Sequence, residues 1–339
     1  MNENKMITVL LFFIIAIMRM IQTVCNKRVS NELKNTKTFF LYSVYYQALA
    51  AVFSLLALSF VGFKGLTFST VVCAFVMAAF LMINFYANLN AIKGCKLIVC
   101  SMFSYGGLIV CCVLSWIMFG EKMSVLQGVG LVLFFLSAYM ISSQKKETEE
   151  KASSPITKKV WLLLIVVTLS EGVMEVSQKY FSKRITEGEV AWFSFFMFLF
   201  STAIMATGYV ITAIKNRTVI KTNEPIQSLL QTQELSVTES EGVAVGKKRL
   251  NKVLLISGVL LAFSVFVINT LVTEMGKKIS SVILFPVIAL ISICITVFVG
   301  WIIYKEKLTT KNIIGVILGL IAVFVLSVCT PETLSKIFS

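Results

Sequence analysis

Long apolar runs alternate with short polar connections along almost the whole chain. An α-helix rises about 1.5 Å per residue, so about 20 apolar residues are needed to cross the roughly 30 Å hydrocarbon core of a membrane. By this measure the runs predict about ten membrane-spanning helices. Their ranges are 6–25, 39–63, 67–90, 97–119, 125–143, 160–182, 190–214, 253–274, 279–304 and 311–329. The expected fold is therefore an all-α integral membrane protein.

One short motif occurs twice, once near the end of each half of the chain. An aromatic residue, a Glu-Lys corner, a Ser or Thr that can cap a helix and a glycine follow one another in both copies. The first copy comprises Trp116, Phe119, Glu121, Lys122, Met123, Ser124 and Gly130, and the second comprises Trp301, Tyr304, Glu306, Lys307, Leu308, Thr309 and Gly315, each 185 positions later. Because each half holds an odd number of spans, five, the second half enters from the opposite membrane face. The sequence thus predicts two inverted five-helix repeats.

Polar segments divide the chain into units. We assign 1–143 to the first five-helix repeat, 144–159 to a charged polar linker, 160–330 to the second repeat and 331–339 to a tail. Residues 215–252 carry Thr, Glu, Gln and Ser without helical apolar periodicity, so we expect a poorly ordered loop there. The first apolar run has no small-residue cleavage site after it, which favours a span over a signal peptide.

The composition agrees with a membrane location. The chain is 57% hydrophobic and 14% charged, and its mean hydropathy is +0.87, values that a soluble domain of this length does not show. Its 31 Lys and Arg outnumber 17 Asp and Glu. Since most of these cations lie between apolar runs, they indicate positively charged membrane loops rather than a nucleic-acid-binding surface.

Several kinds of chemistry find no support in the sequence. The chain contains no histidine, so the usual zinc ligand and the commonest general base are both missing. The eight cysteines lie in or beside apolar runs and are interpreted as small core residues. No nucleotide-binding loop of the Walker type is present either. We therefore expect no enzyme, no metal, no cofactor and no direct use of ATP.

With its duplicated corner in two five-helix halves, the chain resembles the drug/metabolite transporter superfamily, in particular its ten-helix EamA-like members. The resemblance covers nearly the whole chain and implies a secondary transporter, or permease, with a central cavity between the repeats. Two features depart from the family pattern. Residues 16–22 read AIMRMIQ where a Trp-Gly pair is frequent, and Ser101 stands where the second copy has Pro286.

Three charged residues fall inside predicted spans, where each costs on the order of 3 kcal/mol on insertion scales. They are Arg19 in the first span and Glu171 and Glu175 in the sixth. Because the two spans start from opposite faces, Arg19 and Glu171 are expected roughly 7 Å apart in depth. They could pair directly or bracket a small substrate. A structural ion pair between the repeats is the alternative interpretation.

Polar neighbours follow at helical spacing on the same faces. Gln22 and Asn26 follow Arg19, and Gln178 follows Glu175, whereas the third and eighth spans contribute further amides. The candidate substrate-binding residues are Arg19, Gln22, Asn26, Asn84, Asn88, Glu171, Glu175, Gln178 and Asn269. Ser101, Ser104 and Tyr105 are further candidates for the cavity wall, with Thr270 and Glu274 beside Asn269. The amides could instead hold helices together.

These residues favour transport of a small polar or zwitterionic metabolite, such as an amino acid, by alternating access across the plasma membrane. The expected partners are the small-molecule substrate, membrane lipid and, as a coupling ion, protons, with the multi-pass chain acting as a monomer or homodimer. Two alternatives remain: a proton-coupled exporter of cationic drugs, and a membrane partner protein that transports nothing.

Charge also predicts an orientation. Most Lys and Arg lie in the odd-numbered connections between spans, for example at 27–37, 145–159 and 215–252. The positive-inside rule then places these connections in the cytoplasm and both termini outside. Single cysteines introduced into 215–252 of a variant without native cysteines should be protected from an impermeant thiol reagent on intact cells. Labelling from outside would contradict this orientation.

Overall fold

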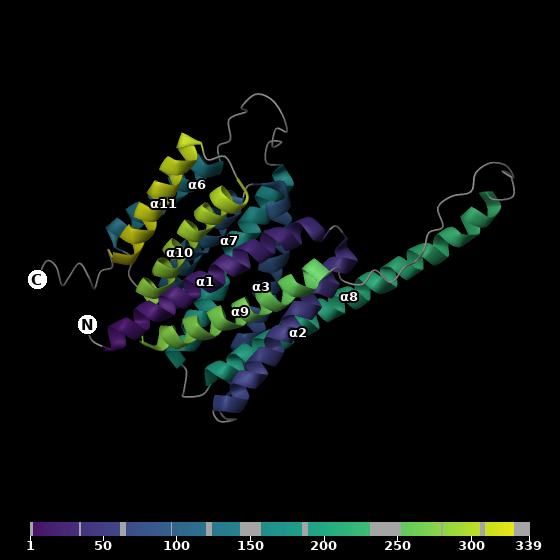
Figure 1. Cartoon of the computed structure of the whole chain (residues 1–339), viewed down its shortest axis with the longest axis horizontal. Helices are drawn as coiled ribbons and strands as arrows, with labels where there is room; N and C mark the ends of the chain where they lie inside the picture. Colours follow the sequence, from purple (N-terminus) through teal and green to yellow (C-terminus); the bar gives the residue numbers. More distant parts are fainter. Residues whose placement is uncertain are drawn as a thin grey trace, which may run out of the picture.

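The computed structural model describes residues 3–33, 35–61, 66–95, 97–119, 124–142, 157–184, 189–230, 252–278, 281–305 and 309–328. This part of the chain is almost entirely helical and contains no strand. Its elements are α1 (Glu3–Glu32), α2 (Thr36–Val61), α3 (Phe68–Gly94), α4 (Leu97–Tyr105), α5 (Gly107–Phe119), α6 (Val125–Ser142), α7 (Lys158–Arg184), α8 (Glu189–Leu230), α9 (Lys252–Lys278), α10 (Ser281–Phe298), the π-helical turn η1 (Val299–Ile303) and α11 (Thr310–Val328). Figure 1 shows these helices gathered into one bundle.

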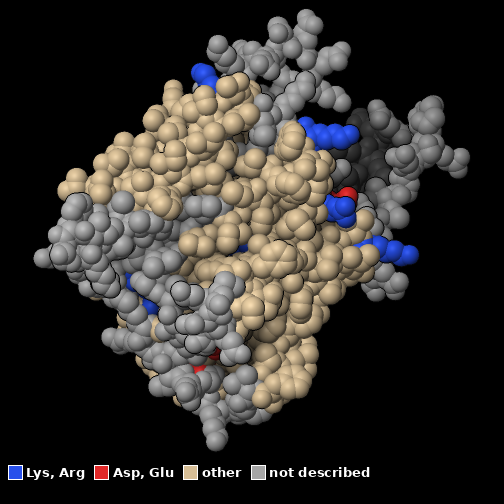
Figure 2. Space-filling view, turned by 60° about the vertical axis from the view of Figure 1, so that its left-hand side comes forward, with Lys and Arg blue, Asp and Glu red and all other residues tan. Residues whose placement is uncertain are grey.

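Six of the described helices are long and apolar enough to cross a membrane. These stretches are Met6–Glu32, Thr36–Phe60, Phe68–Gly94, Lys158–Ser182, Glu189–Ile214 and Lys252–Gly276. Large apolar side chains cover their outer faces: Phe60 is 89% and Phe68 83% exposed. In Figure 2 a broad uncharged surface carries Lys and Arg chiefly near its margins. This surface matches a protein embedded in a membrane.

The helices pack mainly against helices from the other half of the chain. α2 lies along α8, and α6 lies along α11. α3 packs against α7 and α8, while α1 and α2 both pack against α9. In Figure 1 the pair α6 and α11 occupies one end of the bundle, with α1 and α9 crossing its centre. The two halves are therefore interleaved rather than separate.

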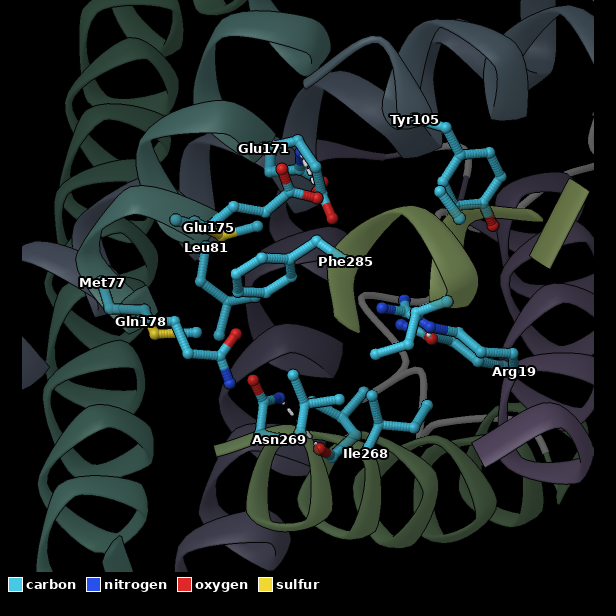
Figure 3. A pocket seen from close by; sticks show the side chains of 17 residues that line it. Arg19, Met77, Leu81, Tyr105, Glu171, Glu175, Gln178, Ile268, Asn269 and Phe285 are labelled. Atoms are coloured by element: carbon cyan, nitrogen blue, oxygen red, sulfur yellow. Dashed lines mark hydrogen bonds between the residues drawn. The ribbon is translucent and has the colours of Figure 1, made fainter. Parts of the chain in front are cut away.

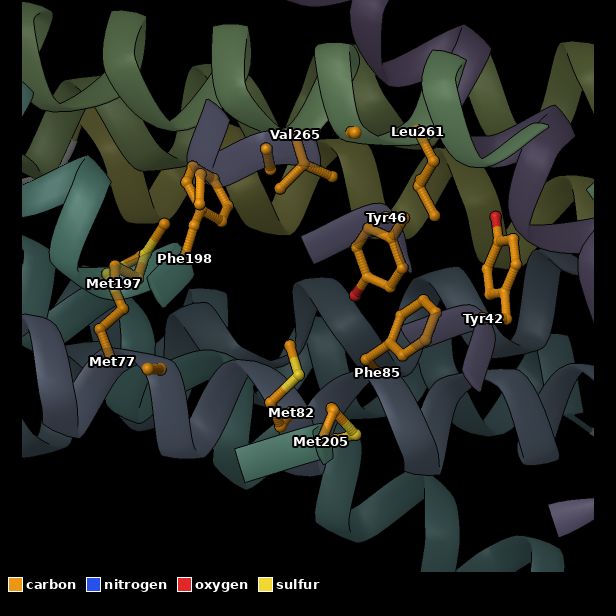
Figure 4. Close-up of a cluster of buried hydrophobic side chains, with 14 of the residues drawn as sticks. Tyr42, Tyr46, Met77, Met82, Phe85, Met197, Phe198, Met205, Leu261 and Val265 are labelled. Atoms are coloured by element: carbon orange, nitrogen blue, oxygen red, sulfur yellow. The ribbon is translucent and has the colours of Figure 1, made fainter. Parts of the chain in front are cut away.

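An aromatic and methionine-rich core joins α2, α3, α8 and α9 (Figure 4). Tyr42 and Phe193 are fully buried in it, and the ring of Phe193 stacks on Phe181 at 4.0 Å between centroids. Lipid tails are as apolar as these side chains, so close packing rather than exclusion of water holds membrane helices together. Flexible methionines such as Met82 and Met205 fill the remaining irregular spaces.

Three elements differ from the sequence-based expectation. The span expected over 97–119 is broken at Gly106, where α4 ends and α5 begins. The Phe103 carbonyl at the break accepts a hydrogen bond of 2.7 Å from the Thr168 hydroxyl of α7. A break is tolerated inside a membrane protein when neighbouring side chains satisfy the freed backbone groups. In the second half, the span expected over 279–304 begins as α10, which runs through Pro286 as one helix, and ends in the irregular turn η1.

The third difference concerns the expected loop at 215–252. Residues up to Leu230 continue α8 as a helix, whereas a poorly ordered loop was expected from residue 215 onwards. Extending an existing helix by one residue requires no new nucleation, which allows a helix to continue into a polar sequence. The rest of that loop to residue 251, the linker 144–156, the tail 331–339 and the Glu-Lys corners at 121–122 and 306–307 lie outside the described residues.

The contact between α5 and α7 depends on two glycines. A Cβ added at Gly172 would meet the backbone carbonyl of Gly107 at 2.7 Å, and one added at Gly107 would meet the backbone nitrogen of Gly172 at 2.8 Å. Real Cβ atoms essentially never come closer than 3.0 Å to another heavy atom, and the backbone cannot move aside as a flexible side chain can. These glycines therefore allow the two helix backbones to touch.

We expect Gly172→Ala to destabilise the protein by about 1–3 kcal/mol, because the added methyl group forces α5 and α7 apart. The matched control is Gly128→Ala on α6, where an added Cβ meets no atom within 4 Å. Alanine is the better helix former, so the control should be neutral or more stable by up to about 1 kcal/mol. Thermal unfolding in detergent measures both. Equal melting temperatures for the two variants would contradict the close contact.

Candidate functional site

A cavity of about 100 Å³ lies at the centre of the bundle between α1, α3, α4, α7, α9 and α10. We call it the charged cavity, because both signs of charge line it. Its polar lining residues are Arg19, Gln22, Asn84, Tyr105, Glu171, Glu175, Gln178 and Asn269. Its apolar lining residues are Met77, Leu81, Met174, Val265, Ile268, Val272, Phe285, Ile288 and Ala289. The lining thus comes from both halves of the chain.

A second cavity of about 50 Å³ adjoins the first. We call it the neutral cavity, because none of the described Lys, Arg, Asp or Glu residues lines it. Its lining residues are Gln22, Asn26, Tyr46, Leu81, Asn84, Phe85, Asn88, Leu89, Leu261 and Val265. Gln22, Leu81, Asn84 and Val265 line both cavities. The two spaces therefore share one wall, formed by α1, α3 and α9.

The structure brings all nine candidate binding residues to these two cavities. Arg19, Glu171, Glu175, Gln178 and Asn269 line the charged cavity, Asn26 and Asn88 line the neutral one, and Gln22 and Asn84 line both. Tyr105 also lines the charged cavity, whereas Ser101 and Ser104 are not among its lining residues and Glu274 is exposed on α9. The nine residues therefore line cavities as the sequence pattern suggested, and their binding of a substrate stays a prediction.

The direct pair between Arg19 and Glu171 that the depth argument allowed is not formed. Arg19 Nη1 donates to Gln22 Oε1, one turn along α1, at 3.1 Å. Glu171 Oε2 instead accepts a hydrogen bond of 2.9 Å from Asn84 Nδ2 of α3. In Figure 3 Arg19 lies well apart from the two glutamates that line the cavity. Depth alone does not fix which way the two side chains point around the bundle, which is why the sequence argument left this open.

Two charged side chains of the cavity have buried atoms that lack a hydrogen-bond partner. They are Oε2 of Glu175 and Nε of Arg19. Leaving such an atom unsatisfied costs about 1–3 kcal/mol, and more when the group is charged. Natural proteins retain groups of this kind chiefly at functional sites. The pair therefore indicates a place where a polar ligand completes the hydrogen bonding.

Some of the amides serve helix packing at the same time. Gln178 Nε2 donates to Thr273 Oγ1 of α9 at 2.8 Å, and Asn269 Nδ2 donates to the Val265 carbonyl of its own helix at 2.9 Å. Asn84 reaches α7, where it also bonds the Val167 carbonyl and the Ser170 hydroxyl, both at 3.2 Å. The interpretation of these amides as links between or within helices is therefore compatible with their place in the cavity wall.

Sequence reasoning missed the apolar and aromatic part of the wall. Phe285 lies between α7 and α9 in Figure 3, and Met77, Leu81 and Met174 also line the charged cavity. Tyr46 does the same for the neutral cavity. In a chain that is 57% hydrophobic, nothing distinguishes an apolar residue that faces a cavity from one that faces lipid or the core.

The described residues hold no group of three or more His, Cys, Asp or Glu side chains that could bind a metal ion. What the site offers is separation of charge. One carboxylate pair faces the cavity from α7 and one guanidinium from α1, without an ion pair between them. Such an arrangement can hold the ammonium and carboxylate groups of one small molecule at the same time.

Comparison with known proteins adds information on the fold only. No protein-family model and no curated protein matches the chain. Among solved structures, one whose title says only that it is the crystal structure of a protein is 12% identical, with a TM-score of 0.55. The match covers 95% of this chain and 97% of that one. At this identity it shows that the helical arrangement of nearly the whole chain occurs in another protein.

We expect Glu175→Gln to leave the melting temperature unchanged or to raise it, because the amide keeps the shape of the side chain without a buried charge. The same variant should bind a small ammonium solute such as ethanolamine at least about tenfold more weakly. Glu32→Gln at the exposed end of α1 is the control and should change neither property. Loss of stability with unchanged affinity would identify Glu175 as a structural residue.

Proposed function

We propose that this protein is a secondary transporter, of the kind found in the drug/metabolite transporter superfamily, that carries a small polar or zwitterionic metabolite across the plasma membrane. The observation that carries the proposal is the charged cavity, in which Arg19 and Glu175 face a shared space and each keeps an unsatisfied buried atom. A membrane-embedded bundle keeps such groups at its centre when they bind a polar solute on its way across.

The pairing of helices supports two inverted repeats. The first half's α1, α2, α3 and α6 are matched here with α7, α8, α9 and α11 of the second half. With this correspondence, the most extensive contacts between the halves have counterparts with the halves exchanged. The contact of α3 with α7 matches that of α1 with α9, and the contact of α3 with α8 matches that of α2 with α9. α2 with α8 and α6 with α11 are pairs of corresponding helices. Rocking of one such repeat against the other is a common basis of alternating access.

The size of the site favours a small solute. A water molecule needs about 10–15 Å³ of comparable volume, so the charged cavity holds roughly seven to ten waters. Pockets for drug-sized ligands usually measure about 300–1,000 Å³. The observed cavity therefore fits a molecule of about the size of an amino acid.

Export of cations is the second candidate function, and the unsatisfied carboxylate of Glu175 is the observation that favours it.

Gradients are the proposed energy source, and Glu175 is the proposed coupling site. A carboxylate within the bundle can take up a proton from one side of the membrane and release it on the other. The charged or titratable groups that line the cavity with it are Glu171 of α7, Arg19 of α1 and Tyr105 of α4. Binding a solute next to Glu175 would change the free energy of protonating the Glu175 carboxylate. This coupling would link solute flux to proton flux.

Flux into proteoliposomes, measured with radiolabelled amino acids with and without a pH gradient, tests the function. We expect flux with the wild-type protein and none with the double variant Arg19→Leu and Glu171→Leu, which should still fold because leucine is tolerated in an apolar bundle. Glu175→Gln should in addition abolish the dependence of binding on pH, since an amide does not titrate.

Arg28→Leu is the matched control, because Arg28 is an exposed residue of the same helix and lines neither cavity. It should retain wild-type flux. If the double leucine variant also transports at the wild-type rate, Arg19 and Glu171 serve only the stability of the bundle. If no solute class moves through the wild-type protein, the proposal of transport is wrong.

A further inference from the structure

The neutral cavity provides hydrogen-bonding groups that the described part of the chain leaves unused. Oδ1 of Asn26 is buried without a partner. The amide of Asn88 lines the same cavity and makes no hydrogen bond to any described residue. Tyr46 accepts a hydrogen bond from Gln47 Nε2 at 2.7 Å through its hydroxyl oxygen, which leaves the hydroxyl hydrogen available to donate. Both hydrogen-bond donors and acceptors thus belong to residues that line one small uncharged space.

These groups come from three helices of the first half. Asn26 lies on α1, Tyr46 on α2 and Asn88 on α3, one helical turn after Asn84. The aromatic ring of Phe85 lines the cavity beside them and stacks obliquely on Tyr46 at 4.8 Å between centroids. A wall of this kind, apolar with a few convergent polar groups, is typical of a site that recognises one part of a ligand.

The position of the neutral cavity next to the charged cavity indicates which part of the ligand it binds. The two cavities share Gln22 and Asn84 in their walls and therefore lie directly next to each other. We propose that the carried solute is a zwitterion with an uncharged hydrogen-bonding tail, an amide or a hydroxyl, and that Asn26, Tyr46 and Asn88 bind this tail. This inference rests on the proposed function, whose site is the charged cavity.

The arrangement also predicts selectivity. An apolar tail of the same shape would cover the half-buried side chains of Asn26 and Asn88 without offering them hydrogen-bond partners, which is costly for a polar group removed from water. Sites that hydrogen-bond a polar group of the ligand reject analogues that lack it much more strongly than apolar pockets reject an extra methylene. The neutral cavity should therefore distinguish solutes that the charged cavity binds equally.

The experiment compares L-glutamine with L-homoleucine, its apolar isostere, by isothermal titration calorimetry on the purified full-length protein. Both probes carry the same zwitterionic head, so only the tail differs. We expect glutamine to bind at least about tenfold more tightly. Asn88→Leu should weaken glutamine binding by about tenfold and leave homoleucine within about twofold, and Tyr46→Phe should act in the same direction.

Asn90→Leu is the matched control on the same helix. Asn90 Nδ2 donates to the Tyr86 carbonyl of α3 at 2.8 Å, and the residue lines neither cavity. It should leave both affinities unchanged. Binding of homoleucine by Asn88→Leu serves as the test that this variant is folded.

Three results would overturn the inference. If glutamine and homoleucine bind the wild type with equal affinity, the neutral cavity does not recognise the polar tail, although the proposed binding site for the zwitterionic head stands. If Asn88→Leu weakens both probes to the same extent, Asn88 supports the bundle rather than the tail. If neither probe binds, the inference about the tail is wrong, whereas the proposed function is decided by the flux experiment with the other solute classes.

Discussion

The structure depends on one constraint, which is that a polar group inside a membrane-embedded bundle must find its partner within the protein. Many described hydroxyl groups find this partner within their own helix. Ser43 and Ser201, for example, each donate a hydrogen bond of 2.8 Å to the backbone carbonyl one turn earlier. Among the described side chains that leave a buried polar atom without a partner, Arg19, Glu175 and Asn26 share one location, because all three residues line the same pair of cavities. A polar solute, or water in its absence, is the partner that such groups lack.

Contact between the backbones of α5 and α7 fixes the position of the two glutamates of the site. Gly107 and Gly172 let α5 and α7 touch, and a Cβ on Gly107 would also meet the side chain of Glu171. Lipid does not drive helices together as water does, so small residues that permit close approach take over that role. The α7 carboxylates therefore stand on a helix whose position is fixed by packing, as a binding site requires.

Interleaving of the two halves explains why one site can respond to a change in the whole bundle. Arg19 and Asn84 belong to the first half, whereas Glu171 and Asn269 belong to the second, and all four line one cavity. In the proposed transport cycle, any movement of one half against the other changes the distance between these groups. A solute that binds both sets of groups would then favour one arrangement over the other by its differential affinity.

The sequence by itself determined the helices and the polar residues of the site. Apolar runs locate most of the helices to within a few residues, because the cost of exposing backbone to lipid leaves long helices as the simplest solution, whereas α1 and α8 extend well beyond the expected spans. Charged and amide residues within those runs identified the nine candidate side chains, since each is too costly to be incidental. The repeated corner motif suggested the duplication, although its Glu-Lys residues lie outside the described structure.

Only the tertiary structure decided how these parts meet. It pairs Arg19 with Gln22 and Glu171 with Asn84 rather than with each other, because side-chain direction depends on the rotation of each helix in the bundle. It breaks the fourth expected span at Gly106, where Thr168 from a distant helix satisfies the Phe103 carbonyl. It also separates a neutral cavity from a charged one, a division that depends on three-dimensional packing and leaves no periodic signal in the chain.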